Sequence, residues 1–194
     1  TCFVKQRPPG YTGARGGRAT RTESELYEEG IAAGRSGDYG RAAELLTILV
    51  GRSDRFPQAL LYLGRSRHAL GQHAQAVQAF SFFLREKPGS AAGHFFLGRS
   101  LLALGDVSSA VRSLRRALEC SPDMAPAWGL LGLAYARARR FGRAVESFKA
   151  ALRIDPQNPR LVTGYLNASL VFAIRLFYQG RLIDSAEVFQ EVLR

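Results

Sequence analysis

The chain has 194 residues, of which 46% are hydrophobic and 22% charged, and its formal charge is +11. This balance is typical of a soluble globular protein, and no segment approaches the roughly 18 to 20 uninterrupted apolar residues that a membrane-spanning helix needs. The most apolar run, 166–178, is broken by Asn167 and Arg175 and predicts a buried helix, while the positive charge is compatible with nucleic acid, anionic lipid or acidic protein as a partner.

Residues 1–22 are predicted to form a flexible basic arm. They hold five basic and no acidic residues, with four glycines and two prolines, a composition that buries too little apolar surface to order itself. Cys2 allows a lipid anchor at a mature N-terminus, although the upstream signal that would show it is not in the sequence. With only Cys2 and Cys120, neither a disulfide framework nor a zinc site is expected, and the compartment stays open between the cytoplasm and a bacterial periplasm.

From residue 23 the sequence repeats with a period of 34 residues. Each copy holds two apolar stretches at helical spacing, separated by a turn, and therefore predicts a helical hairpin. One hairpin cannot bury its apolar face alone, so the copies at 23–56, 57–90, 91–124 and 125–158 are expected to stack into an array that covers 23–194. The recurring residues are Gly30, Gly64, Gly98 and Gly132, then Ala42, Ala76, Ala110 and Ala144, then Leu46, Phe80, Leu114 and Phe148.

The stretch 159–194 is an irregular fifth copy. Gly180, Ser185 and Phe189 fit the second half of a repeat only if Ala173 takes the position of the small crossing residue, seven residues later than the period predicts. Seven residues are close to two helical turns, so the first helix can lengthen and still present the same face. We therefore predict one long helix over about 159–179.

The sequence stops inside the last predicted helix without the polar capping element that usually closes such an array. Val188, Val192 and Leu193 are predicted to form a C-terminal interface. A following repeat, a capping helix or a second copy of the chain would cover it, because an uncovered apolar strip is a liability. Self-association through this face is thus one expected outcome.

The copy at 125–158 carries the most specific motif. Trp128, Leu131, Gly132 and Tyr135 follow the W-x2-L-G-x2-Y spacing, and Ala144, Phe148 and Pro156 come after them. In these positions the sequence resembles the tetratricopeptide repeat (TPR) family, over about 23–158. The resemblance implies an all-α fold, a right-handed superhelical solenoid of about five hairpins, the last one irregular with a lengthened first helix.

In this family the first helices of successive repeats line a concave groove, and the resemblance assigns inward positions relative to the small crossing residue. Arg65 and Arg99, from the two copies of the sequence LGRS, are then expected to stand side by side. Guanidinium forks suit carboxylates, and aromatic neighbours suit the apolar side chains of an extended peptide, although such arginines can equally serve only to keep a groove soluble. The predicted partner-binding residues are Tyr27, Arg35, Arg65, His68, Phe95, Arg99, Arg137, Phe177 and Tyr178.

No catalytic constellation is present in the sequence, and His68, His73 and His94 lack the spacing of a metal site, so we expect neither an enzyme nor a cofactor or metal. We predict a protein–protein interaction scaffold, a module of a larger protein or complex, that binds a peptide or partner protein in an Arg-lined groove. The Lys and Asn pair of the co-chaperone carboxylate clamp is absent from the first helices. The alternative is a basic module for nucleic acid or an anionic surface, supported by the charge and by the clusters Arg112/Arg115/Arg116 and Arg137/Arg139/Arg140/Arg143.

Overall fold

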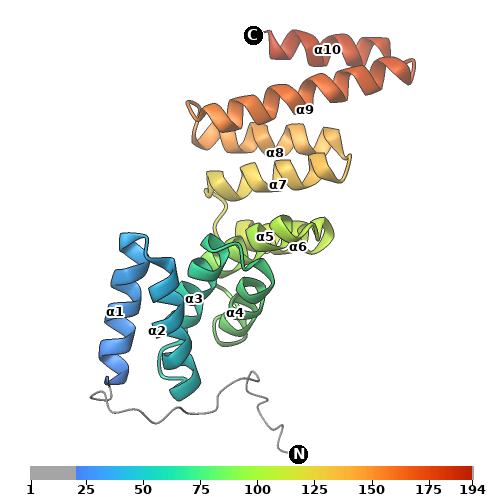
Figure 1. Cartoon of the computed structure of the whole chain (residues 1–194). Coiled ribbons are helices and arrows are strands. Elements are labelled where there is room, and N and C mark those ends of the chain that lie inside the picture. The colour runs from blue at the N-terminus through green and yellow to red at the C-terminus, as the bar shows by residue number, and fades with distance from the viewer. Residues whose placement is uncertain (1–20, 194) are drawn as a thin grey trace, which may run out of the picture. The chain divides into compact units, whose positions relative to one another are not determined.

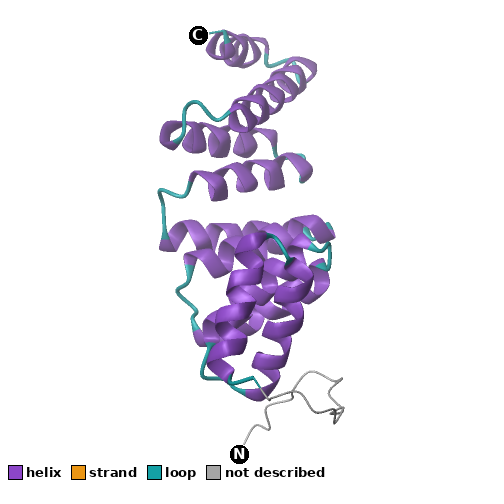
Figure 2. Ribbon diagram, turned by 60° about the vertical axis from the view of Figure 1, so that its left-hand side comes forward, coloured by secondary structure: helices purple, strands orange, loops and turns teal. Residues whose placement is uncertain are grey.

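The computed structural model describes residues 21–193, and between these residues it contains helices and loops but no strand (Figure 2). The helices pair in chain order as antiparallel hairpins and fall into two compact units, α1–α4 before Lys87 and α5–α10 after it. The all-α prediction is confirmed. The helices are α1 (Glu23–Ser36), α2 (Tyr39–Arg52), α3 (Pro57–Ala69), α4 (His73–Glu86), α5 (Ala91–Leu104), α6 (Val107–Cys120), α7 (Ala125–Arg137), α8 (Phe141–Ile154), α9 (Pro159–Tyr178) and α10 (Leu182–Val192) (Figure 1).

The start of the first hairpin is fixed by a capping box. The Thr22 hydroxyl accepts a hydrogen bond from the Glu25 amide, and the Glu25 carboxylate accepts one from the Thr22 amide, which satisfies two backbone donors that the helix cannot. Arg21 pairs with Glu29 at 3.4 Å. Most of the predicted arm, residues 1–20 with Cys2, lies outside the described residues, as does Arg194.

The turns inside the hairpins depend on left-handed backbone. Gly37, Gly71, Gly105 and Gly180 have φ between 75° and 89°, a conformation that glycine adopts without steric cost. In the α7–α8 turn the corresponding residue is Arg139, which keeps the left-handed conformation with φ of 57°. The fourth hairpin thus has the same turn as the others in spite of its different sequence.

The 34-residue glycines lie where the two helices of a hairpin cross. A Cβ atom added to Gly64 would stand 2.5 Å from the Phe80 ring, and one added to Gly98 would stand 2.7 Å from Leu114 Cγ. Phe80 and Leu114 are fully buried. Each recurring glycine therefore packs against the recurring large apolar residue of its own hairpin, and Gly30 with Leu46 and Gly132 with Phe148 repeat the contact.

Phe148 also joins one hairpin to the next. Its ring lies against Gly132 of α7 on one side and against Gly164 of α9 on the other, where an added Cβ would stand 2.5 Å from the ring. In the fifth copy Ala173 is fully buried, and the buried Ser185 hydroxyl donates to its carbonyl at 2.9 Å. The predicted long helix and its shifted crossing residue are both confirmed.

The expectation that 166–178 is a buried helix is wrong. Helix α9 packs against α7, α8 and α10, but Leu166, Leu170, Ile174 and Phe177 are exposed on its remaining surface. Among the described helices, α9 is the one whose length and composition would allow a membrane span, and 28% of that span is buried in the fold. Helices of soluble proteins also meet this criterion.

Candidate protein-binding surface

An aromatic cluster lies between α1 and α3 in the first unit. The ring centroids of Tyr27 and Phe56 are 5.0 Å apart, with the planes inclined by 30°. Burial raises the pKa of the Tyr27 phenol above its ordinary value, Tyr62 raises it further, and the Arg35 guanidinium lowers it. Tyr27, Tyr62 and Arg35 are therefore close enough to interact, which places two aromatic rings and a guanidinium group in one region.

The two LGRS arginines lie over aromatic rings of their own helices. The guanidinium carbon of Arg65 is 5.6 Å from the centre of the Tyr62 ring, and that of Arg99 is 5.0 Å from Phe96 and 6.0 Å from Phe95. Arg65 is exposed, where a contact of this kind is worth about 0.5–1 kcal/mol, and Arg99 is half-buried. The contact restrains the orientation of the guanidinium group.

The positions that the family resemblance assigns to the groove include Phe95 but neither Tyr62 nor Phe96. The sequence does contain a pattern that predicts these two rings. Both copies have an aromatic residue three positions before the arginine, in YLGRS and in FLGRS. Residues three apart are neighbours on a helix surface. Arg65 belongs to the first unit and Arg99 to the second, so their side-by-side arrangement remains a prediction.

Arg137, predicted as a groove residue, has a structural role that the repeat pattern does not indicate. Its Nη1 donates to the Leu102 carbonyl at 2.7 Å and so links the last turn of α7 to that of α5. Arg175 makes the corresponding link one hairpin later, to the Arg139 carbonyl at 2.9 Å. The Leu102 carbonyl also accepts a hydrogen bond from the Gly105 amide, so Arg137 adds a second donor to it from the next hairpin.

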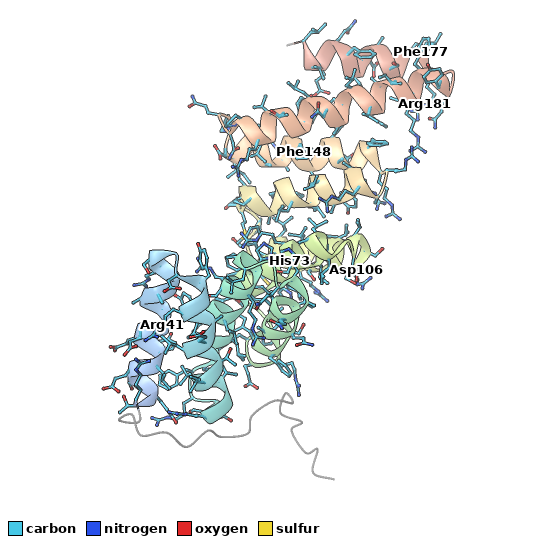
Figure 3. All side chains as sticks on the ribbon, in the orientation of Figure 1. Arg41, His73, Asp106, Phe148, Phe177 and Arg181 are labelled. Atoms are coloured by element: carbon cyan, nitrogen blue, oxygen red, sulfur yellow. The ribbon has the colours of Figure 1, made fainter. Side chains whose placement is uncertain are left out.

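The remaining predicted residues lie at the ends of their helices. His68 is half-buried beside the α3–α4 turn, with its ring centroid 4.8 Å from that of His73. Phe177 and Tyr178 are 56% and 83% exposed at the end of α9, and their rings meet edge to face at 5.7 Å. Figure 3 shows Phe177 at this end of the helix. Together with Leu170 and Ile174, Phe177 gives α9 an exposed apolar face.

The C-terminal residues differ in their surroundings. Val188 and Val192 are half-buried, and they share a helix face with Ser185, which bonds to α9. Leu193 is 86% exposed. Leu182, Ile183 and Phe189 of α10 are also exposed apolar side chains. Together with Leu193 they form an uncovered apolar strip, which lies on a different face of the helix from Val188 and Val192.

Metal-ligand side chains do not gather in the part of the chain that the structure describes. Between residues 21 and 193, no three His, Cys, Asp or Glu side chains lie close enough together to hold a metal ion. The first helices of two hairpins, α3 and α5, instead each carry an arginine that lies over an aromatic ring of the same helix.

The helical hairpins and their 34-residue spacing define a helical-repeat protein. The family model described as "Tetratricopeptide repeat" matches residues 27–91 and 95–159, and the chain belongs to that family. No curated protein shows significant similarity to the whole sequence.

Solved structures of similar fold include several named MamA. "Crystal structure of MamA protein" is 19% identical with a TM-score of 0.73, and the match covers 88% of this chain and 90% of that one. "MamA 41-end from Desulfovibrio magneticus RS-1" is 22% identical with a TM-score of 0.72, and the match covers 90% and 96% of the two chains. At this level of identity the likeness shows the fold.

Family membership settles the broad class of function. Tetratricopeptide repeats are non-catalytic scaffolds for protein–protein interaction, and this chain is one of them. The prediction of a protein-binding scaffold without enzymatic activity is therefore confirmed at that level.

Proposed function

We propose that the first-helix faces bind an extended, acidic segment of a partner protein. The observation that supports this most directly is the repeated placement of an arginine over an aromatic ring, Arg65 on Tyr62 and Arg99 on Phe96. A guanidinium group held in this way offers a fixed fork of donors for a carboxylate. The neighbouring rings, Tyr27 in the first unit and Phe95 in the second, supply apolar contact for the adjoining side chains of the peptide.

The distribution of charge favours a peptide over a nucleic acid. Residues 21–86 contain eight basic and eight acidic residues, a net charge of zero, whereas residues 87–193 contain fourteen and eight, a net charge of +6. A protein that follows a phosphate backbone needs a continuous basic stripe. Residues 21–86 have no such excess, so Arg35 and Arg65 provide local anion contacts within a neutral segment.

Titrations across salt concentration test this proposal. Glutamate-rich peptides, single-stranded DNA and duplex DNA are titrated into the wild type, the double variant Arg65→Gln with Arg99→Gln, and the control Arg115→Gln on α6. We expect the double variant to lose about tenfold in peptide affinity, because hydrogen bonds between charged groups are worth roughly 1.5–3 kcal/mol each. The control should bind as the wild type does.

The alternative function makes the opposite prediction. DNA binding releases counterions and weakens by orders of magnitude between low and physiological salt. Tight, salt-steep DNA binding that survives the loss of Arg65 and Arg99 would replace the peptide proposal with the basic-module alternative.

We also propose that the exposed strip of α10 is an interface with a second copy of the chain. Phe189 occupies the position in α10 that Phe148 occupies in α8, and it is 39% exposed where Phe148 is 6% exposed. The difference arises because α9 covers Phe148, and no described helix follows α10. The apolar residues that an additional helix would cover are Leu182, Ile183, Phe189 and Leu193.

A further inference from the structure

A pocket of about 400 Å³ within the second unit is lined by arginines and no carboxylate. It lies between the α7–α8 turn and the C-terminal end of α9. The α9–α10 turn is on the same side of the unit (Figure 1). Phe172 and Leu176 of α9 contribute its apolar surface, and none of the predicted partner-binding residues lines it. Its five arginines are Arg139, Arg140, Arg143, Arg175 and Arg181, the last labelled in Figure 3.

Two of these arginines replace residues that other hairpins use for stability. Arg139 stands where Gly37 and Gly105 make the turns of the first and third hairpins. Arg140 stands where Asp38 and Asp106 cap the following helix, each by accepting a hydrogen bond from a backbone amide. Helix α8 has no side-chain cap.

The fourth hairpin therefore gives up two stabilising features at one point. A residue other than glycine adopts the left-handed conformation of Arg139 only at a steric cost, and an uncapped helix leaves backbone donors unsatisfied. In exchange, two arginines line the pocket, and the change from Asp to Arg raises the local charge by two units. Such a departure from the repeat indicates a role for the charge that the hairpin fold does not itself require.

Most of this charge has no acidic partner in the described residues. Arg181 pairs with Asp184 at 2.6 Å, and Arg175 donates to the Arg139 carbonyl, which is uncharged. Arg143 lies 5.8 Å from the centre of the Tyr135 ring. Between residues 21 and 193, no carboxylate oxygen is within ion-pair distance of Arg139, Arg140, Arg143 or Arg175. The five guanidinium groups and the one paired carboxylate leave a net charge of +4.

We propose that this pocket binds an oligophosphate, a ligand with two or more linked or clustered phosphoryl groups. Arginine binds phosphoryl oxygens through two parallel N–H donors, and several arginines around one pocket match several such groups. A ligand with three or four negative charges would balance the charge of the pocket, whereas a single carboxylate or orthophosphate would balance only part of it. The free oligophosphate and the phosphorylated headgroup of a lipid share this chemistry.

The test uses a variant that restores the sequence of the other hairpins. Arg139→Gly supplies the usual turn residue and Arg140→Asn a good helix cap, so the double variant should unfold at a higher temperature than the wild type. Its loss of binding could then not be attributed to misfolding. Arg112→Gln with Arg115→Gln on α6 removes the same charge from another helix and is the matched control.

Calorimetric titration with inorganic tripolyphosphate and with orthophosphate measures the site. We expect tripolyphosphate to bind the wild type at least about tenfold more tightly than orthophosphate, and the pocket variant to lose about tenfold or more, because each charged hydrogen bond contributes roughly that factor. The α6 control should change the affinity by less than about twofold, since screening weakens distant charges. Cosedimentation with phosphatidylcholine vesicles, with and without phosphatidylinositol bisphosphate, distinguishes a lipid headgroup from a free oligophosphate as the ligand.

The outcomes separate clearly. Binding of tripolyphosphate alone assigns the site to a free oligophosphate, and additional binding of phosphoinositide vesicles that the pocket variant loses assigns it to a lipid headgroup. The proposal is wrong if the wild type binds neither probe. It is equally wrong if the α6 control loses as much affinity as the pocket variant, because the effect would then come from net charge.

Discussion

Replacing Gly98 by alanine tests how the hairpins are held together. The added Cβ would stand 2.7 Å from Leu114 Cγ and 3.3 Å from the Ala110 carbonyl oxygen, where ordinary carbon contacts are about 3.5–4.0 Å. Leu114 is fully buried and cannot move away freely. Overpacking of this kind costs about 1–3 kcal/mol, against a gain of about 1 kcal/mol from replacing glycine in a helix, so we expect a net loss of up to about 2 kcal/mol.

The matched control is Gly34→Ala in α1. A Cβ atom there would meet Ala42 Cβ at 3.7 Å and Ser66 Oγ at 3.8 Å, which are ordinary contacts, so only the helical gain of up to about 1 kcal/mol remains. Thermal unfolding followed by circular dichroism should move in opposite directions for the two variants, by about 2–4 °C per kcal/mol. In a protein that already carries Leu114→Ala, the further change Gly98→Ala should cause little additional loss of stability. If Gly98→Ala stabilised the protein as Gly34→Ala does, the crossing would not be the tight contact described above.

Three further predictions concern the ends and caps of helices. Phe189→Glu with Leu193→Glu should abolish any dimer seen by sedimentation without loss of helix content, and a dimer that persists would place the interface elsewhere. Hydrogen bonds from the Ser109 side chain and amide lower the pKa of Asp106 below its ordinary value, so this cap stabilises the fold above the unfolded-state pKa, and that stability is lost as pH falls through the lower folded-state pKa. Asp106→Ala should therefore lower the melting temperature at neutral pH and make the melting temperature depend less on pH in the acidic range. If the melting temperature of the variant depended on pH as that of the wild type does, the role of the cap would be contradicted. Tyr62→Leu should weaken acidic-peptide binding by less than Arg65→Gln does, because it removes only the restraint on the guanidinium group, and a larger effect would make the ring the main contact.

The fold could be predicted because the repeat places physical constraints at fixed spacing. Gly98 and Leu114 recur with a 34-residue period because the helix crossing needs one small and one large residue each time. The shift of the crossing to Ala173 was also predictable, since two extra turns return a helix to the same face. The exposure of 166–178 could not be predicted. Whether an apolar helix face is covered depends on the neighbouring helices, and the spacing of apolar residues within one helix does not reveal where those neighbours lie.

The candidate binding surface could be predicted only in part. The positions of Arg65 and Arg99 follow from the repeat, but the rings beneath them depend on side-chain pairs within a helix that the family pattern does not include. Arg137 was selected as a groove residue, yet its bond to the Leu102 carbonyl joins two hairpins, a tertiary contact that no local pattern encodes. Three arginines of the pocket were visible in the sequence only as part of the cluster Arg137/Arg139/Arg140/Arg143, because Arg175 and Arg181 join them from more than thirty residues away.

The most direct test of the proposed acidic-peptide surface is an unbiased peptide selection. Peptides are selected on the wild-type protein from a random display library, and their affinities are then measured for the Arg65→Gln, Arg99→Gln double variant and for the Arg115→Gln control. The proposal predicts peptides rich in Asp and Glu that lose about tenfold or more in affinity for the double variant and keep it for the control. Selected peptides that are neutral or basic, or that bind the double variant as tightly as the wild type, would contradict it.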